Sequence, residues 1–149
     1  MRRRLPQGFT LVEIIVVLAL GALLALIAVP NVVSLLSRYR LSGATRQVMG
    51  DLMWARMQAV TQKNEFKVVI LDEYRYRILD DDDNDGTTGP GERIWVTDLR
   101  KNYPGVVIGH TADPVFFPGG SAAMGTITLA NQSGSKKLKI HITGRVKSV

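Results

Sequence analysis

The chain has 149 residues, no cysteine and a formal net charge of +6. This length suffices for one modest domain plus an anchoring segment, and the lack of cysteine excludes disulfides and thiolate metal sites. The positive charge lies at the two ends, because residues 2–4 are arginines and five basic residues, with no acid, follow Asp113. The C-terminal end is therefore the part whose charge bears on binding partners.

An uncharged run of 24 residues, Ile14 to Ser37, follows a single glutamate, Glu13. About 20 helical residues cross a bilayer core of about 30 Å, so this run is long enough to span a membrane. The arginines at 2–4 favour a cytoplasmic N-terminus, which places the chain after Arg38 outside the cytoplasm. An ordinary cleaved signal peptide and a plain membrane anchor are the alternatives. Neither explains Glu13, because a carboxylate at this depth is costly unless it is paired.

The segment GFTLVE and the apolar run after it resemble the N-terminus of type IV pilins and pseudopilins. The resemblance implies that a prepilin peptidase cleaves after Gly8 and that the new N-terminal residue, Phe9, is methylated. Glu13 matches the family's signature glutamate, and Pro30 falls where the family often has a helix-kinking proline. It further implies that the Glu13 carboxylate of one subunit meets the Phe9 ammonium of its neighbour in a filament. In a low-dielectric setting this pairing offsets a large desolvation cost.

Beyond Pro30, apolar residues recur at spacings of three and four, which predicts an amphipathic helix. One helix is expected from about Thr10 to about Gln62, with Lys63-Asn64 as its stop. The residues expected on its inward face are Leu41, Ala44, Val48, Leu52, Ala55 and Ala59.

After Asn64 the hydrophobic period changes to two, which predicts strands. Seven segments are expected to be strands: EFKVVIL, YRYRIL, RIWVT, GVVIG, VFFPG, TITLA and KLKIHIT. In the last one, Leu138, Ile140 and Ile142 are expected to face inward. A helix followed by antiparallel strands is an α+β fold. The predicted organisation is a leader peptide at 1–8, a transmembrane helix half at 9–37 and a periplasmic globular domain at 38–149, helical to about 63.

The globular part resembles the GspH/FimT minor pseudopilins. The segment LMWARMQAVTQKN is similar to the end of that subgroup's helix, and VFFPGG, GTITL and KIHITGRVK are similar to its closing strands and terminal Gly-Arg signature. The resemblance implies a pilin-like fold and a minor, tip-located subunit of a type II secretion pseudopilus or a type IV pilus. The implied partners are other pilin or pseudopilin subunits, prepilin peptidase and the bacterial inner membrane.

The acidic segment DDDNDGTTGPGE fits the calcium-loop pattern D-x-[DN]-x-[DN]-G-x5-E at every fixed position. Carboxylate and carbonyl oxygens are ligands that favour calcium over a transition metal. The flanks are predicted strands, so this would be a calcium loop on a β-hairpin rather than an EF-hand. The alternative is a solvated acidic turn, since Asp, Asn and Gly favour turns anyway. The expected ligands are the side chains of Asp81, Asp83, Asp85 and Glu92 and the backbone carbonyl of Thr87.

The basic C-terminal segment allows two interpretations. Lysines and arginines on one strand face form a solvated surface, or they contact DNA phosphates. Some FimT-like minor pilins bind DNA through a C-terminal Gly-Arg region, and the matching residues in GRVK are Arg145 and Lys147. His110 and His141 stand apart from acids and other ligands in the sequence, and no catalytic grouping is evident. An enzyme is therefore not expected. The favoured function is a minor pseudopilin in filament initiation and protein secretion, with a DNA-capturing minor pilin as the alternative.

Overall fold

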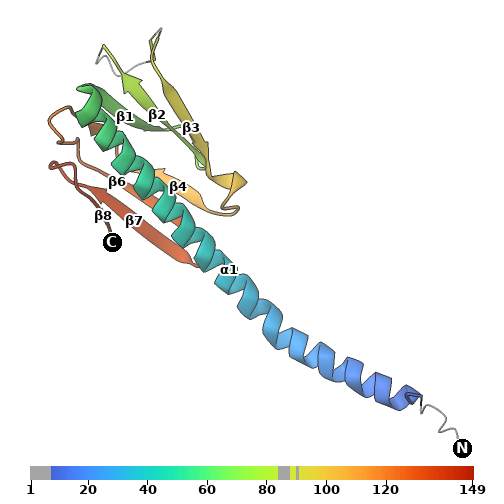
Figure 1. Ribbon diagram of the computed structural model, residues 1–149. Coiled ribbons are helices and arrows are strands. Elements are labelled where there is room, and N and C mark those ends of the chain that lie inside the picture. Colours follow the sequence, from blue (N-terminus) through green and yellow to red (C-terminus); the bar gives the residue numbers. More distant parts are fainter. Residues whose placement is uncertain (1–7, 84–87, 90) are drawn as a thin grey trace, which may run out of the picture. The chain divides into compact units, whose positions relative to one another are not determined.

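A computed structural model describes residues 8–83, 88–89 and 91–149 (Figure 1). The chain forms two compact units, which meet in sequence between Leu36 and Ser37. One helix, α1 (Leu11–Gln62), supplies most of the first unit and the opening part of the second. The helix continues without a break through Pro30, so the backbone tolerates the lost hydrogen bond that a proline imposes there.

Both ends of α1 are capped by local hydrogen bonds. At its start, the Thr10 hydroxyl oxygen accepts from the Glu13 N–H at 3.2 Å. This is the first half of a capping box, a pattern that Thr and Glu three residues apart often form at a helix start. At its end, Lys63 adopts a left-handed conformation with φ of 59°, and the Asn64 N–H donates to the Ala59 carbonyl at 3.2 Å. The predicted stop at Lys63-Asn64 is thus confirmed as a Schellman-type end.

The inward face of α1 follows the predicted pattern. The six residues expected there are all buried: Leu41, Ala44, Val48, Leu52, Ala55 and Ala59. Three of the six are alanines, so the sheets can approach the helix backbone closely over this stretch. This face belongs to the hydrophobic core, to which both sheets contribute.

In the part of the chain that the structure describes, eight strands form two four-stranded antiparallel sheets rather than one. The first sheet has the order β3-β2-β1-β5 and the second has the order β4-β6-β7-β8. The first comprises β1 (Glu65–Ile70), β2 (Arg75–Asp81), β3 (Ile94–Asp98) and β5 (Val115–Phe116). The second comprises β4 (Val107–His110), β6 (Gly125–Asn131), β7 (Gly134–Ile140) and β8 (Val146–Ser148). A short 3-10 helix, Leu99–Lys101, follows β3.

The last predicted strand was too long, and its register at the end was wrong. β7 ends at Ile140, and the chain turns so that the Gly144 N–H donates to the His141 carbonyl at 2.8 Å. Ile142 lies in this turn and is 65% exposed rather than inward-facing. The chain then returns as β8, whose Val146 takes the buried position opposite Ile140.

A half-buried polar pair and an aromatic cluster complete the contacts between α1 and the first sheet. The Tyr76 hydroxyl donates to Asp51 Oδ2 at 2.5 Å. Burial raises the pKa of Asp51 above its usual value, and the hydrogen bond from Tyr76 opposes that rise. Trp54 of α1 meets Trp95 of β3 edge-on with ring centroids 4.8 Å apart. The two tryptophans are thus packing residues.

Candidate functional site

The predicted cleavage and assembly residues lie at the exposed start of α1. Gly8, Phe9 and Glu13 are all exposed in the structure. Phe9 and Glu13 line one shallow surface groove together with Ile14, Val17 and Leu18. The structure therefore brings the Phe9 side chain and the Glu13 carboxylate to one apolar face of the helix.

The apolar side chains of the first unit lack a core of their own. Every large apolar residue from Phe9 to Leu36 whose burial the structure describes is exposed. Among the described residues, α1 is long and apolar enough to cross a membrane, and its most apolar 18-residue window has a mean hydropathy of 2.9. Burial of this surface must come from lipid or from other chains.

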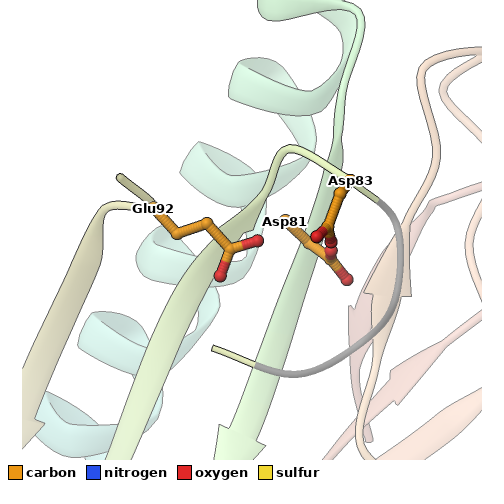
Figure 2. A group of neighbouring side chains, drawn as sticks. All are labelled: Asp81, Asp83 and Glu92. Carbon is orange, nitrogen blue, oxygen red and sulfur yellow. The ribbon is translucent and has the colours of Figure 1, made fainter. Parts of the chain in front are cut away.

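Three of the five predicted metal ligands converge at the tip of the β2–β3 hairpin. Carboxylate oxygens of Asp81, Asp83 and Glu92 lie within 4.8 Å of one another. Asp81 ends β2 and is buried, while Asp83 is exposed and Glu92 is half-buried. Figure 2 shows Glu92 pointing across the hairpin toward the two aspartates. Asp85 and Thr87, the other two predicted ligands, lie outside the described residues.

The three carboxylates fit a hard cation. Glu92 Oε2 accepts from the Gly89 N–H at 2.6 Å, whereas the buried Oε1 atom has no hydrogen-bond partner among the described residues. Calcium binds oxygen ligands at about 2.3–2.6 Å, so oxygens up to roughly 5 Å apart can share one ion. The spacing in the triad falls within that reach. An acidic triad that can hold an ion is therefore present at the hairpin tip.

The neighbouring acid, Asp80, has a different role that sequence reasoning missed. It is buried and accepts from Asn64 Nδ2 at 2.8 Å and from Arg93 Nη2 at 2.7 Å. Asn64 also donates to Asp82 at 2.6 Å, and Arg93 donates to Gln62. These bonds tie the end of α1 to the base of the hairpin. Four consecutive aspartates carry no periodic signal that would separate this structural acid from the candidate ligands.

The basic C-terminal residues lie on exposed parts of the second sheet. Lys147 of β8 is directly opposite Lys139 of β7, and both are exposed. Arg145 is exposed in the turn just before β8. Like charges at directly opposite strand positions repel each other. Exposed lysines in this arrangement are also typical of a solvated surface. The geometry fits either interpretation of the segment, and the comparisons described below give no support to DNA binding.

One expectation about the histidines was wrong. His110 does have an acidic neighbour, because its Nε2 lies 3.3 Å from Asp113 Oδ1. The same Asp113 oxygen accepts from the Ile70 N–H at 3.2 Å, so this carboxylate also holds the β1 backbone. The pair joins a loop to a strand.

Comparison with protein families identifies the chain. Residues 44–144 match the family model described as type II transport protein GspH. The chain belongs to the GspH family. Residues 3–29 match a second model, the prokaryotic N-terminal methylation motif. This minor pseudopilin is thus a structural protein and not an enzyme. Among curated proteins, none matches its sequence.

Solved structures show the same fold. The minor pseudopilin EpsH of the type 2 secretion system of Vibrio cholerae is 12% identical, with a TM-score of 0.59 over 74% of this chain and 96% of that one. The type IV minor pilin FimU of Pseudomonas aeruginosa is 18% identical, with a TM-score of 0.58 over 74% of this chain and 88% of that one. At these identities the likeness concerns the fold, a long N-terminal helix packed on antiparallel sheets.

The pseudopilin's Ala-Arg helix segment and its terminal Gly-Arg segment meet in space. Arg56 Nε of α1 donates to the Gly120 carbonyl at 3.0 Å, and its Nη2 donates to the Thr143 carbonyl at 3.2 Å. Gly144 lies against the same arginine with a φ of 71°, and a Cβ there would be 2.1 Å from the Gly120 carbonyl oxygen. One arginine thus fastens two loops of the second unit to the helix, which gives both segments a structural purpose.

Proposed function

We propose that the chain is a minor pseudopilin that helps to initiate a short filament, or sits at its tip, in a machine for protein secretion. The methylation-motif match at residues 3–29, followed by the GspH match, is the observation that carries this proposal. Before assembly, the apolar segment at 9–37, which includes the first part of α1, anchors the chain in the inner membrane. The N-terminus lies in the cytoplasm and the globular domain at 38–149 lies in the periplasm, because residues 2–4 are arginines.

Processing removes residues 1–8. Prepilin peptidase cleaves between Gly8 and Phe9, and Phe9 is then methylated. The exposed start of α1 supports this step, since a peptidase needs access to that bond. Mass spectrometry of the N-terminus from native membranes tests it, with a methylated Phe9 as the expected first residue. A mature chain that begins after Ala25 or Ala28 would identify an ordinary signal peptidase and overturn the proposal.

Glu13 acts in assembly with other pilin subunits. Glu13 lines the same groove as Phe9, and in a filament its carboxylate would pair with the ammonium of a neighbouring subunit. Glu13→Ala should leave the chain processed and inserted but poorly incorporated, because a lone carboxylate in an apolar helix marks a pairing function. Thr10→Ala is the matched control, since it removes the helix cap and keeps the charge. Cross-linking of sheared filaments measures incorporation, and equal incorporation of Glu13→Ala and wild type contradicts the pairing.

The acidic triad binds calcium. Three observations support this assignment: the spacing of Asp81, Asp83 and Glu92, the all-oxygen ligand set, and a Glu92 oxygen with no hydrogen-bond partner among the described residues. Asp85 and the Thr87 carbonyl would complete the shell according to the sequence pattern. The ion would supply positive charge that offsets the repulsion among acids in this loop. The ion would also stabilise the hairpin, and it would take part in no chemical reaction.

Calcium should raise the melting temperature of the chain. A ligand that binds only the folded form contributes about 2.7 kcal/mol at a hundredfold excess over its dissociation constant. Extracellular-type sites bind at roughly 0.1–1 mM, so the titration has to reach several millimolar. Asp83→Ala and Glu92→Ala should lose most of the gain. Asp82→Asn is the control, because Asp82 bonds to Asn64 and is not a predicted ligand. An unmoved wild-type melting curve would leave only an acidic turn.

A further inference from the structure

The stretch that directly follows the apolar run has the composition of a membrane interface. Arg38 is the first charged residue after Glu13, and Tyr39 and Arg40 come next. Tyr39 is 63% exposed and Arg38 is also exposed. Tyrosines gather at the headgroup level of membranes, where their rings have one apolar and one wet end. Arginines at the outer end of a span are less expected, since positive residues favour the cytoplasmic side.

The turn between β6 and β7 contacts α1 just after the apolar run. Asn131 Nδ2 donates to the Ser37 carbonyl at 2.7 Å, and Lys136 Nζ donates to Ser42 Oγ at 3.0 Å. Figure 1 shows this turn beside α1. Both contacts lie within the second unit, so they fix the turn against the segment that emerges from the apolar run.

A surface pocket lies between these two segments. Arg38, Leu41 and Ser42 line it from the helix, and residues 133–136 line it from the turn and β7. The lining brings together two cations, Arg38 and Lys136, and the hydroxyls of three serines, with no acid. Lys136 points to the helix side of β7, whereas Lys137 and Lys139 lie on the exposed opposite face. An arginine, a lysine and hydroxyl donors are the groups that bind a phosphate.

We propose that this pocket binds the phosphate of an anionic phospholipid headgroup at the periplasmic surface of the inner membrane. The inference rests on the proposed anchoring of residues 9–37 in that membrane. A lipid headgroup is favoured over a soluble anion because Arg38 directly follows the apolar run. The site would hold the second unit close to the membrane surface until the subunit enters a filament, where the lipid is left behind.

Native mass spectrometry of the full mature chain in a non-ionic detergent tests the site. Phosphatidylglycerol and phosphatidylcholine with the same acyl chains are the probes, and the wild type should retain phosphatidylglycerol selectively. Each basic residue at a membrane surface is worth about a fivefold change in binding, so Arg38→Gln with Lys136→Gln should lose about thirtyfold. Arg38→Gln alone should lose about fivefold, and this variant should fold as the wild type does because the Arg38 side chain is exposed. Lys137→Gln with Lys139→Gln, the matched change on the opposite face of β7, should bind as the wild type does.

Several results would overturn the lipid site. They are equal retention of the two lipids, an equal loss in the Lys137 and Lys139 control, displacement by millimolar inorganic phosphate, or displacement by a DNA duplex. The third would assign the pocket to free phosphate and the fourth to nucleic acid. Flotation with phosphatidylcholine vesicles separates this failure from that of the proposed anchoring. Chains that float without lipid selectivity keep the anchor and lose the headgroup site, whereas wild-type chains that fail to float overturn both.

Discussion

The two parts of α1 share one backbone geometry but bury their side chains in different ways. In the part before Leu36, the large apolar residues are exposed wherever burial is described, as Leu24 is at 68%. In the part after Ser37, one face is buried, as Leu52 is with only 1% of its surface exposed. Three of the six core positions on this face are alanine. The first part is apolar all round, and the second is apolar along one stripe.

This difference shows where each part finds its stabilising surface. A stripe is enough when the same chain supplies two sheets to cover it. An all-round apolar helix has no polar face to leave in water, so it needs lipid or neighbouring subunits on every side. The second part therefore contributes to the stability of a monomer, and the first is available for the membrane and filament contacts that we propose.

The largest effect should come from truncating one leucine in each part. Leu52→Ala leaves a cavity in the core and should lower the free energy of unfolding by about 2–5 kcal/mol. Leu24→Ala should change it by less than about 0.5 kcal/mol, because the Leu24 side chain is 68% exposed. Chemical denaturation of the full chain in detergent measures both. Similar losses in the two variants would break the comparison.

A second effect concerns how the buried part is fastened. Gly144→Ala should lower the free energy of unfolding by more than the roughly 1–2 kcal/mol that a left-handed alanine costs, because its Cβ also meets the Gly120 carbonyl and Arg56. Gly105→Ala is the control with a similar φ of 85° and open space around the new atom. The difference between the two melting curves isolates the close contact. If Gly105→Ala lowers the free energy of unfolding as much as Gly144→Ala does, the packing around Arg56 does not fasten the helix.

The smallest effect is a pH dependence in the buried part. Burial raises the pKa of Asp51, so the folded state holds this proton more tightly than the unfolded state, whose value is near 3.8. Its contribution to stability is present at low pH and decreases as pH rises from about 3.8 through the folded pKa. Asp98 acts in the opposite direction, since its bond to Arg100 lowers its pKa to about 2.

Asp51→Asn isolates the first of these two groups. The difference in unfolding free energy between wild type and this variant should change over that window, while Asp98 cancels because both chains carry it. Asp51→Ala should show the same change with pH and should in addition cost about 1–3 kcal/mol, since the Tyr76 hydroxyl loses its acceptor. A pH-independent difference for Asp51→Asn would show that burial does not shift Asp51.

The sequence predicted the elements with a strong period and missed those that depend on distant contacts. Leu41 and Ala59 bracket a helical repeat that can be read directly, and it was confirmed. β8 was missed because Ile142 continues the alternation of β7, while a hydrogen-bonded turn at Gly144 stops it. Periodicity does not report a turn that tertiary packing enforces.

The candidate sites show the same division. The calcium-loop pattern anticipated that Asp81, Asp83 and Glu92 converge, because ligand spacing is local in sequence. The role of Asp80 could not be predicted from the sequence, because its partners Asn64 and Arg93 each lie more than ten residues away along the chain. The Arg38 and Lys136 pocket likewise joins segments nearly a hundred residues apart.

The hydrogen bonds around Asp80 also bear on the entropy cost of closing the loop between β2 and β3. Arg93 and Asp80 join the two ends of the loop, and Asn64 fastens Asp80 and Asp82 to the end of the helix. The loop is therefore a closed ring before any ligand arrives, and closure of its ends is part of folding rather than of binding. The affinity of the proposed calcium site should therefore depend on a salt bridge that donates no ligand to the ion. Arg93→Ala should weaken calcium binding while every carboxylate of the triad remains in place.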